Sequence, residues 1–294
     1  MLEVKQDSIA IACASGGFKA VFVHGVLSAF EANNFSPNAY SAASASVVVA
    51  ALAKIAKARE AGIDYWLKGI EMYDRTKSMS QVSLAGINYF NGCGDKEFFD
   101  SQKSDFYIAA SKVITKKAAQ QTQSKQARRL GKKLLIAAAK KEHSWVNEHL
   151  KLDLFSTLAK DSLTLSRENF TEVAYASTRM LHNYDAPAWI NNQPYVDASY
   201  TCSCPALEMV ERGYQTVIAI ATETDRFYRD LFQREIIPTE YKQTPIHIIQ
   251  PNIDLKELGV GVFQATAEGL AAVYQHGLEK GKEFLTQSNI QQRN

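Results

Sequence analysis

Apolar positions along the chain follow two spacings, which alternate from one end to the other. Short apolar runs predict buried strands at residues 8–13, 38–43, 170–177, 194–199, 216–222 and 246–251. Apolar residues three or four positions apart predict helices at residues 18–34, 44–62, 205–214 and 263–285. Because strands and helices alternate, we expect a three-layer α/β/α fold with a mostly parallel central sheet.

The middle of the chain follows neither pattern clearly. Residues 96–160 are polar and rich in Ala, Gln and Lys, which favour helix, and their apolar residues form only a thin stripe. We expect a helical insertion that covers the core without forming it. With 294 residues, of which 46% are hydrophobic, the chain is long enough for one large domain over residues 1–294 that includes this insertion.

The cysteines and the N-terminus narrow the class of protein. The chain has four cysteines, and only Cys202 and Cys204 are close in sequence, at a C-x-C spacing that suits neither a redox CxxC pair nor a zinc knuckle. We expect a protein of a reducing compartment, without a metal or another cofactor. The apolar run before Gly16 is too short for a signal peptide, and no run of about 18 apolar residues predicts a transmembrane helix. A cytoplasmic protein is expected, whose membrane contacts would be peripheral.

Three serines stand where the second predicted strand meets an apolar helix, at Ser41, Ser44 and Ser46. A serine nucleophile on a strand-to-helix turn requires small residues two positions before and after it. Ser44 has Ala42 and Ser46 there, whereas Ser46 would have the β-branched Val48, and Ser41 would end the strand too early. Ser44 is therefore the candidate nucleophile. A simple helix N-cap is the alternative interpretation of these serines.

The first predicted strand also ends in a turn, whose backbone amides could assist a serine nucleophile. Residues 15–20, SGGFKA, combine two glycines with the start of a helix, whose free amides can bind a negatively charged oxygen. In a parallel sheet, consecutive strand–turn–helix units place their helix N-termini side by side. We therefore expect the amides of residues 16–19 to share one pocket with Ser44. The side chain of Lys19 is expected in solvent at the start of the helix.

These segments resemble the patatin-like phospholipases, and the resemblance covers nearly the whole chain. The family's G-G-G-x-[RK]-G oxyanion loop matches residues 15–20, and its G-V-L-x-A-x-E helix pattern matches residues 25–31. Its G-x-S-x-G turn matches residues 42–46, and its D-G-[GA] motif matches residues 197–199. Flanking stretches at 170–178 and 206–222 are also similar to the family.

The resemblance implies a catalytic dyad without a histidine, a metal or a cofactor. Ser44 would attack the acyl carbonyl of a lipid ester or thioester, and Asp197 would act as its general base. The same resemblance implies an oxyanion hole formed by the amides of Gly16, Gly17, Phe18 and Lys19. The expected function is an acyl hydrolase of the phospholipase or lysophospholipase type, with an acyltransferase as an alternative. An Asx turn is the alternative role for Asp197.

The chain departs from the family at five motif glycines, which are replaced by Ala or Ser at Ser15, Ala20, Ala42, Ser46 and Ala198. Each replacement would cost about 1–2 kcal/mol where the backbone is left-handed, and little elsewhere. A protein that binds acyl lipids without turning them over is therefore the alternative from another class.

A histidine-containing triad is a second structural alternative. Ser44, Asp197 and then His247 or His276 follow the chain order of an α/β-hydrolase triad. In that fold, however, the nucleophile comes after several strands, whereas Ser44 follows only one convincing strand before its own. The patatin-like dyad is therefore the preferred hypothesis.

The positive charge of the chain is concentrated in one segment. Residues 112–141 contain ten Lys and Arg and no acidic residue. Because the net charge of the whole chain is +2, the remaining residues together carry a net charge of −8. Nucleic-acid binding is disfavoured because the segment has no aromatic residue for base stacking. A solvated helix face is the simplest interpretation. A surface for an anionic membrane or an acidic protein partner fits a lipid substrate better, and its candidate residues are Lys125, Arg128, Arg129, Lys132 and Lys133.

Overall fold

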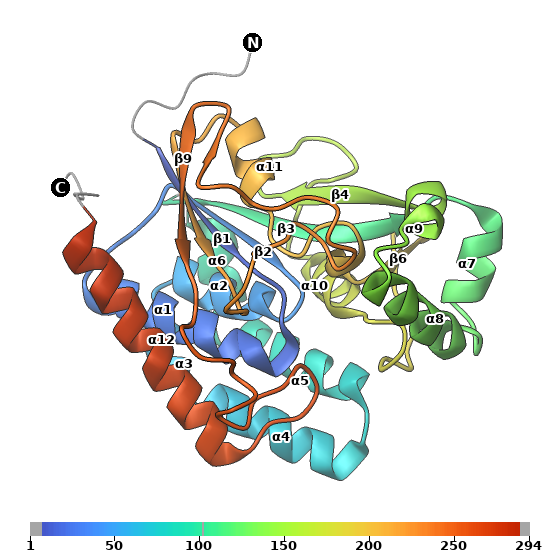
Figure 1. Cartoon of the computed structure of the whole chain (residues 1–294), viewed down its shortest axis with the longest axis horizontal. Helices are drawn as coiled ribbons and strands as arrows, with labels where there is room; N and C mark the ends of the chain where they lie inside the picture. Colours follow the sequence, from blue (N-terminus) through green and yellow to red (C-terminus); the bar gives the residue numbers. More distant parts are fainter. Residues whose placement is uncertain (1–7, 102, 289–294) are drawn as a thin grey trace.

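The computed structural model describes residues 8–101 and 103–288. Figure 1 shows a central sheet with helices on both of its faces, so that the predicted three-layer α/β/α class is confirmed. The strands of the sheet are β1 (Ile9–Cys13), β2 (Ala39–Ala43), β3 (Asp105–Val113), β4 (Leu150–Ser156), β5 (Trp189–Ile190), β6 (Gln193–Val196), β7 (Thr216–Ile220), β8 (Glu240–Tyr241) and β9 (Thr244–Ile249).

The helices connect these strands and form the outer layers. The 3₁₀-helices are η1 (Gly17–Ala20) and η2 (Ala198–Tyr200). The α-helices are α1 (Val21–Ala32), α2 (Ser46–Lys54), α3 (Ala58–Ala61), α4 (Asp64–Thr76), α5 (Met79–Cys93), α6 (Asp95–Asp100), α7 (Lys116–Thr122), α8 (Ala127–Ala139), α9 (Ser144–His149), α10 (Phe170–Thr178), α11 (Ala206–Glu211) and α12 (Ala267–Gln287).

The strand order explains why the sheet is parallel in its middle and antiparallel at its edges. The order is β5-β6-β3-β2-β1-β7-β9-β8, and β4 pairs with the other edge of β3. The central strands β3, β2, β1, β7 and β9 run parallel to one another, whereas β4, β5, β6 and β8 pair with their neighbours in antiparallel fashion. Short hairpin connections are possible only between antiparallel strands. Helix α1 connects β1 to β2, and helices α2 to α6 lie between β2 and β3, whereas the described residues between β7 and β9 contain β8 and no helix.

Strands β2 and β6 meet end to end along the same edge of β3. Ala43, the last residue of β2, pairs with Ala109, and Val196, the last residue of β6, pairs with Ser111. The opposite edge of β3 is taken by β4 along both of these stretches. Strand β2 is parallel to β3 and β6 is antiparallel to it, so the two strands approach Ala110 of β3 from opposite directions. The residues that follow β2 and β6 therefore both lie beside Ala110.

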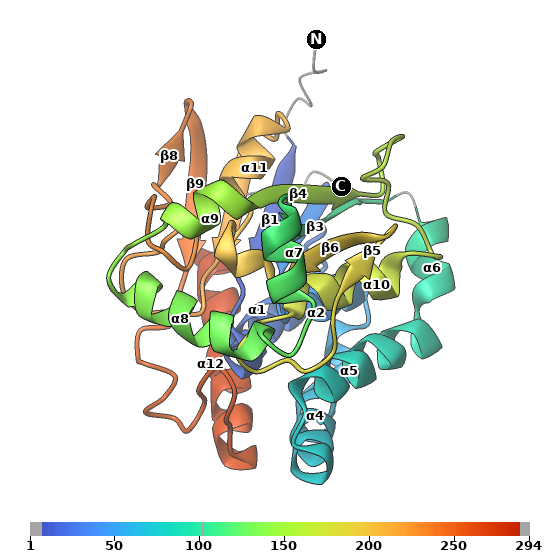
Figure 2. The same cartoon turned by 90° about the vertical axis from the view of Figure 1, so that its right-hand side faces the viewer.

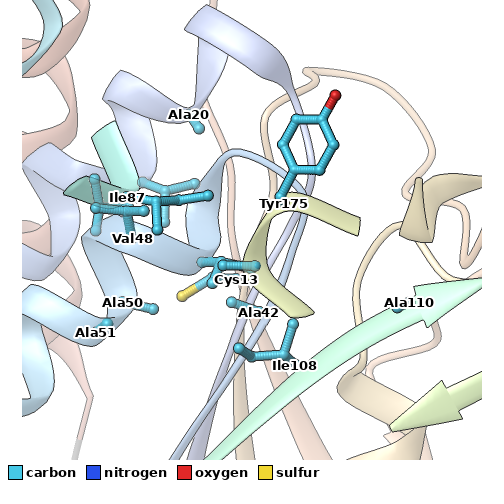
Figure 3. Close-up of a cluster of buried hydrophobic side chains, with 14 of the residues drawn as sticks. Cys13, Ala20, Ala42, Val48, Ala50, Ala51, Ile87, Ile108, Ala110 and Tyr175 are labelled. Atoms are coloured by element: carbon cyan, nitrogen blue, oxygen red, sulfur yellow. The ribbon is translucent and has the colours of Figure 1, made fainter. Parts of the chain in front are cut away.

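Alternate side chains of the central strands pack into two cores. On β1, Ile11 and Cys13 face the helices α1, α2 and α10, whereas Ala10 and Ala12 face the layer that contains α11. Figure 3 shows Cys13, Ala42 and Ile108 of neighbouring strands together in the first core, next to side chains of the helical layer. This period of two is the pattern of a sheet that is covered on both faces.

The long C-terminal helix α12 packs closely along α1 (Figure 1). A Cβ atom on Gly25 of α1 would lie 2.9 Å from the Cα of Gly277 in α12, which is closer than carbon atoms can approach. Glycine is therefore required at both positions for this contact. It gives a structural reason for the glycine in the G-V-L-x-A-x-E stretch of residues 25–31.

The predicted helix at 44–62 is divided into α2 and α3, and the predicted strand at 194–199 ends at Val196, before η2.

Two further predictions of secondary structure are wrong. Residues 170–177 form most of α10 instead of a strand. Phe170 and all residues from Val173 to Thr178 are buried, so this helix is covered on nearly every side and its apolar run resembles that of a buried strand. Residues 96–160 do include helices, but they also contribute the strands β3 and β4. Strand β3 lies in the middle of the sheet, so this part of the chain belongs to the core as well as covering it.

The expected lack of a signal peptide rests partly on residues 1–7, which lie outside the described residues. None of the helices in the described ranges combines the length and the apolar character that a bilayer-spanning helix requires.

Candidate active site

Ser44 occupies a sharp turn between β2 and α2. Its φ angle of 54° lies in the left-handed region, which costs a residue other than glycine about 1–2 kcal/mol. The Ser44 amide donates a hydrogen bond of 2.8 Å to Ser177 Oγ of α10, which holds the turn in place. The N-cap of α2 is Ala45 and has no side-chain cap, so that Ser44 does not serve as a helix cap.

The neighbouring serines have other partners. Ser41 Oγ donates to the carbonyl oxygen of Ile11 at 3.1 Å within the sheet. Ser46 Oγ donates to the carbonyl oxygen of Ala14 at the end of β1. Of the three serines, Ser44 alone lines the cavity described below.

Ser44 and Asp197 form a hydrogen-bonded pair, although 153 residues separate them in sequence. Ser44 Oγ donates to Asp197 Oδ2 at 2.9 Å. The pair forms because β2 and β6 end at the same level of β3, so that the next residue of each strand faces the other. No loop has to fold over to bring the two side chains together.

The second carboxylate oxygen of Asp197 is held by the residues that follow it. Asp197 Oδ1 accepts hydrogen bonds from the backbone amide of Ser199 at 2.8 Å and from Ser199 Oγ. Ser111 Oγ of β3 donates to the backbone carbonyl of Asp197 at 2.7 Å. Asp197 therefore forms the Asx-type turn considered from the sequence, and its other oxygen remains directed at Ser44.

Burial changes the acidity of Asp197. Only 1% of the residue is exposed, and this desolvation raises the pKa of its carboxyl from 3.8 to about 6. The hydrogen bonds from Ser199 and Ser44 stabilise the ionised form and lower the pKa, but the effect of burial is larger. The carboxylate is ionised at neutral pH and is more basic than an exposed aspartate, as a general base requires.

The glycines of the first turn lie beside this pair. Gly17 has a φ of 57°, and a Cβ atom there would collide with the backbone of Val262, so that only glycine fits. The amides of Gly16 and Gly17 have no hydrogen-bond acceptor within residues 8–101 and 103–288, and both glycines line the cavity with Ser44. The amide of Ala45, the N-cap residue of α2, also has no hydrogen-bond acceptor among these residues, and the sequence did not suggest it as an oxyanion donor.

The other two amides of the predicted oxyanion hole are already used. The Phe18 amide donates to the carbonyl oxygen of Val262 at 2.9 Å, and the Lys19 amide donates to that of Gly16 at 3.1 Å. The prediction for Phe18 and Lys19 therefore needs correction, because the chain tightens into η1 at these residues and pairs their amides internally.

The Lys19 side chain is buried, in contrast to the expectation that it lies in solvent. Its relative exposure is 1%, and its ammonium group forms an ion pair with Glu223 at 2.7 Å and lies 3.7 Å from Asp254. These acids come from the loops after β7 and β9. Lys19 thus anchors the glycine turn to two other loops.

The five glycine replacements do not strain the backbone. None of the residues at these positions has a positive φ, and Ala20 has a helical φ of −65°. Ser46 even gains the hydrogen bond to Ala14 that joins the Ser44 turn to β1. Among the motif positions discussed, left-handed geometry is confined to Ser44 and Gly17.

The pair opens into a cavity of about 760 Å³. Its walls include Ser44, Asp197, Gly16 and Gly17, and its other side is formed by residues from the loops that follow β7 and β9. This volume lies within the usual range for small-molecule sites.

The histidines do not complete a triad. All six lie in the described part of the chain, and no hydrogen bond joins any of them to Ser44 or Asp197 there. His247 packs on Phe284 of α12, and His276 packs on Phe22 of α1. The α/β-hydrolase arrangement considered from the sequence is therefore absent from the described residues.

The residues proposed for a membrane or partner surface lie together on α8 and in the turn before it, and we call them the basic surface: Lys125, Arg128, Arg129, Lys132 and Lys133. All five are exposed, and none forms an ion pair with another described residue. Figure 2 shows α7, α8 and α9 together on the side of the molecule that carries β4 and β6.

Comparison with known proteins gives little further information. No protein-family model matches the chain, and no curated protein sequence does. VipD from Legionella pneumophila is a structural neighbour with a TM-score of 0.45 and 9% sequence identity, over 95% of this chain. The chain spans about 66% of the length of VipD. So weak a similarity assigns neither a family nor an activity.

Several residues of the site were not identified from the sequence. Ser177, Ser199 and Ser111 each donate or accept a hydrogen bond at the Ser44–Asp197 pair. Ser177 is the second-last residue of the stretch 170–178 that is similar to the patatin-like family, so the sequence contains a signal for it, although the apolar pattern of residues 170–177 predicts a strand. Ser111 could not be found without the position of β3.

Proposed function

We propose that the protein is an acyl hydrolase that uses Ser44 and Asp197 as a catalytic dyad on lipid esters or acyl thioesters. The observation that carries this proposal is the 2.9 Å hydrogen bond between Ser44 Oγ and Asp197 Oδ2 in the wall of a cavity. The amides of Gly16 and Gly17 lie in the same wall and have no acceptor among the described residues. A nucleophile, a base and oxyanion donors thus face one space.

The reaction follows from these positions. Ser44 Oγ attacks the acyl carbonyl carbon while its proton passes to Asp197 Oδ2. The negative oxygen of the tetrahedral intermediate accepts hydrogen bonds from the amides of Gly16 and Gly17. Asp197 then returns the proton to the leaving alcohol or thiol, and an acyl-Ser44 remains. Water attacks the carbonyl carbon of this ester as it loses a proton to Asp197, and Asp197 then passes that proton to Ser44 Oγ as the bond between Oγ and the acyl carbon breaks, so that the acid is released and both residues return to their starting state.

The resemblance to patatin-like phospholipases supports the same chemistry, since three of the similar segments, residues 15–20, 42–46 and 197–199, each contribute to the lining of one cavity. None of the five residues that stand at motif glycines has a positive φ, so the backbone of the site is not strained there. This supports a catalytic site over a site that binds acyl lipids without turnover. An acyltransferase would share every step up to the acyl-Ser44 and differ only in the acceptor. Product analysis in the presence and absence of an added alcohol separates these two activities.

Labelling with a fluorophosphonate tests the dyad directly. Wild-type protein is expected to form an adduct at Ser44, and Ser44→Ala is expected to form none. Ser41→Ala is the matched control, because this buried serine lies three residues away and donates to a strand carbonyl. Labelling of Ser44→Ala at the wild-type rate, or no labelling of folded wild type, would overturn the proposal.

We further propose that the basic surface docks on an anionic membrane. Helix α8 packs against the residues beside the cavity, since a Cβ atom on Gly131 would lie 2.8 Å from Leu181. The ring of His182 contacts Phe263, which lines the cavity, with ring centroids 5.1 Å apart. The basic surface is thus connected to the cavity wall. Each Lys or Arg near an anionic leaflet contributes about 1 kcal/mol of attraction.

Charge reversal tests this docking. Replacement of Arg128, Arg129, Lys132 and Lys133 by Glu is expected to abolish co-sedimentation with anionic vesicles at low salt, while hydrolysis of a small soluble ester is unchanged. A control with the same change in net charge reverses exposed residues elsewhere: Lys96, Lys160, Lys256 and Lys282. Equal loss in both variants would show that only the total charge matters. Binding of the α8 variant at the wild-type level would refute the docking surface.

A further inference from the structure

A second cavity, of about 450 Å³, lies next to the catalytic cavity. Residues of the helices α2, α4, α5 and α10 form most of its lining, and Figure 1 shows α4 and α5 extending together beyond α2. Its lining is mainly apolar and includes Phe18, Val48, Trp66, Met72, Val82 and Ile87. Figure 3 shows Val48 and Ile87 next to one another where α2 meets α5. We call this space the helical cavity.

The two cavities adjoin each other beside the nucleophile. Gly17, Thr178 and Tyr184 line both of them. Ala45, which follows Ser44 directly, also lines the helical cavity. The hydroxyl groups of Tyr184 and Ser83 lie 2.9 Å apart and form a hydrogen bond, which fixes the aromatic ring between the two spaces.

We propose that the helical cavity binds the acyl chain of the substrate, and that Gly69 of α4 sets how long a chain it accepts. This inference rests on the proposed function, since it concerns the acyl group that Ser44 would attack. An acyl carbonyl at Ser44, with its oxygen toward the amide of Gly17, lies at the junction of the two cavities. The apolar chain then continues into the apolar space, and the polar leaving group stays in the catalytic cavity.

Gly69 is suited to limit the chain length because it leaves room that a side chain would take. A Cβ atom on Gly69 would lie 3.5 Å from the Phe18 ring and 3.8 Å from Val82, which are ordinary contact distances. All three residues line the cavity. A leucine at this position would therefore fit on the helix and project into the space between them. Leucine also favours helix more than glycine does.

Chain-length selectivity tests the proposal. With para-nitrophenyl acetate, octanoate and palmitate, wild-type protein is expected to prefer the longer esters. Gly69→Leu is expected to lower the palmitate-to-acetate ratio of kcat/KM about ten-fold if it excludes roughly two methylene groups. Gly92→Leu on α5 is the matched control, because nothing lies within 4 Å of its added Cβ. An unchanged ratio in folded Gly69→Leu would overturn the proposal.

A binding measurement separates the cavity from the chemistry. Parinaric acid, a fluorescent fatty acid, is expected to bind the Ser44→Ala protein, and the additional Gly69→Leu change should weaken this binding about ten-fold. Binding without any hydrolysis by wild type would reject the proposed function and retain the acyl site. Equal affinity with and without Gly69→Leu, or no binding, would reject the acyl site even if Ser44 is labelled by fluorophosphonates.

Discussion

Asp197→Asn is expected to stabilise the protein above a pH of about 6 while it abolishes hydrolysis. The carboxyl has its pKa raised from 3.8 to about 6 because folding removes it from water. A raised pKa means that the folded protein prefers the protonated form. The corresponding stability is fully present below a pH of about 4 and is lost as the pH rises through about 6.

The size of the effect follows from the pKa shift. A shift of about 2 units corresponds to about 3 kcal/mol in the free energy of unfolding at high pH, which is the net cost of ionising the buried carboxyl with its hydrogen bonds already included. An asparagine has no charge, and its oxygen can still accept the hydrogen bond of the Ser199 amide. The gain will be smaller than 3 kcal/mol, since the asparagine amide has two N–H donors where the protonated carboxyl has one O–H, and the additional donor needs an acceptor.

Thermal unfolding across pH measures this gain. The Tm of Asp197→Asn should exceed that of wild type by several degrees at a pH of about 8, and the difference should vanish toward a pH of about 4. Ser44→Ala is the control, because it is also inactive but keeps the buried charge and loses one of its hydrogen bonds. It should be no more stable than wild type at high pH. A pH-independent difference, or a destabilised Asp197→Asn at a pH of about 8, would refute the reasoning.

Two other predictions concern the groups around the dyad. Ser199→Ala removes a hydrogen bond to the Asp197 carboxylate, so the acid limb of the pH profile of kcat/KM should move up by about 1 unit; Ser203→Ala, in the same cavity wall, should not move it. Lys19→Gln should lower kcat about ten-fold or more with little change in KM, because it frees the glycine turn from Glu223. If Lys19→Arg has a higher kcat than Lys19→Gln, the positive charge anchors the turn. If Lys19→Gln changes only KM, this explanation is wrong.

The sequence was sufficient for the parts of the site that short motifs encode. The turn around Ser44 is defined by small residues at fixed distances, and the glycines at 16 and 17 mark a turn before a helix; both patterns are local. The resemblance to a family predicted that Ser44 and Asp197 lie together. The pattern of residues alone did not predict it. The catalytic roles of both residues stay predictions.

The errors arose where local patterns are ambiguous. Strand β3 is buried on both faces, so its apolar residues do not alternate clearly with polar ones, and its end at Lys112 and Val113 runs into the basic segment. Helix α10 has few turns, and a short apolar run does not separate a strand from a buried helix. The burial of Lys19 depends on Glu223 and Asp254, which are far away in sequence and carry no local signal.

The position of β3 also bears on the five positions at which this chain has alanine or serine and the motifs that it resembles have glycine. The distance between Ser44 and Asp197 is fixed by two strands that end at the same level of β3, and not by the flexibility of the turns that follow. Once the strand ends are fixed, the turn has to be left-handed only at Ser44, where the amide is held by Ser177 and the hydroxyl by Asp197. The flanking positions keep ordinary backbone geometry, so a Cβ atom there costs little. Glycine remains necessary at Gly17, where φ is positive and the backbone of Val262 leaves no room for a side chain.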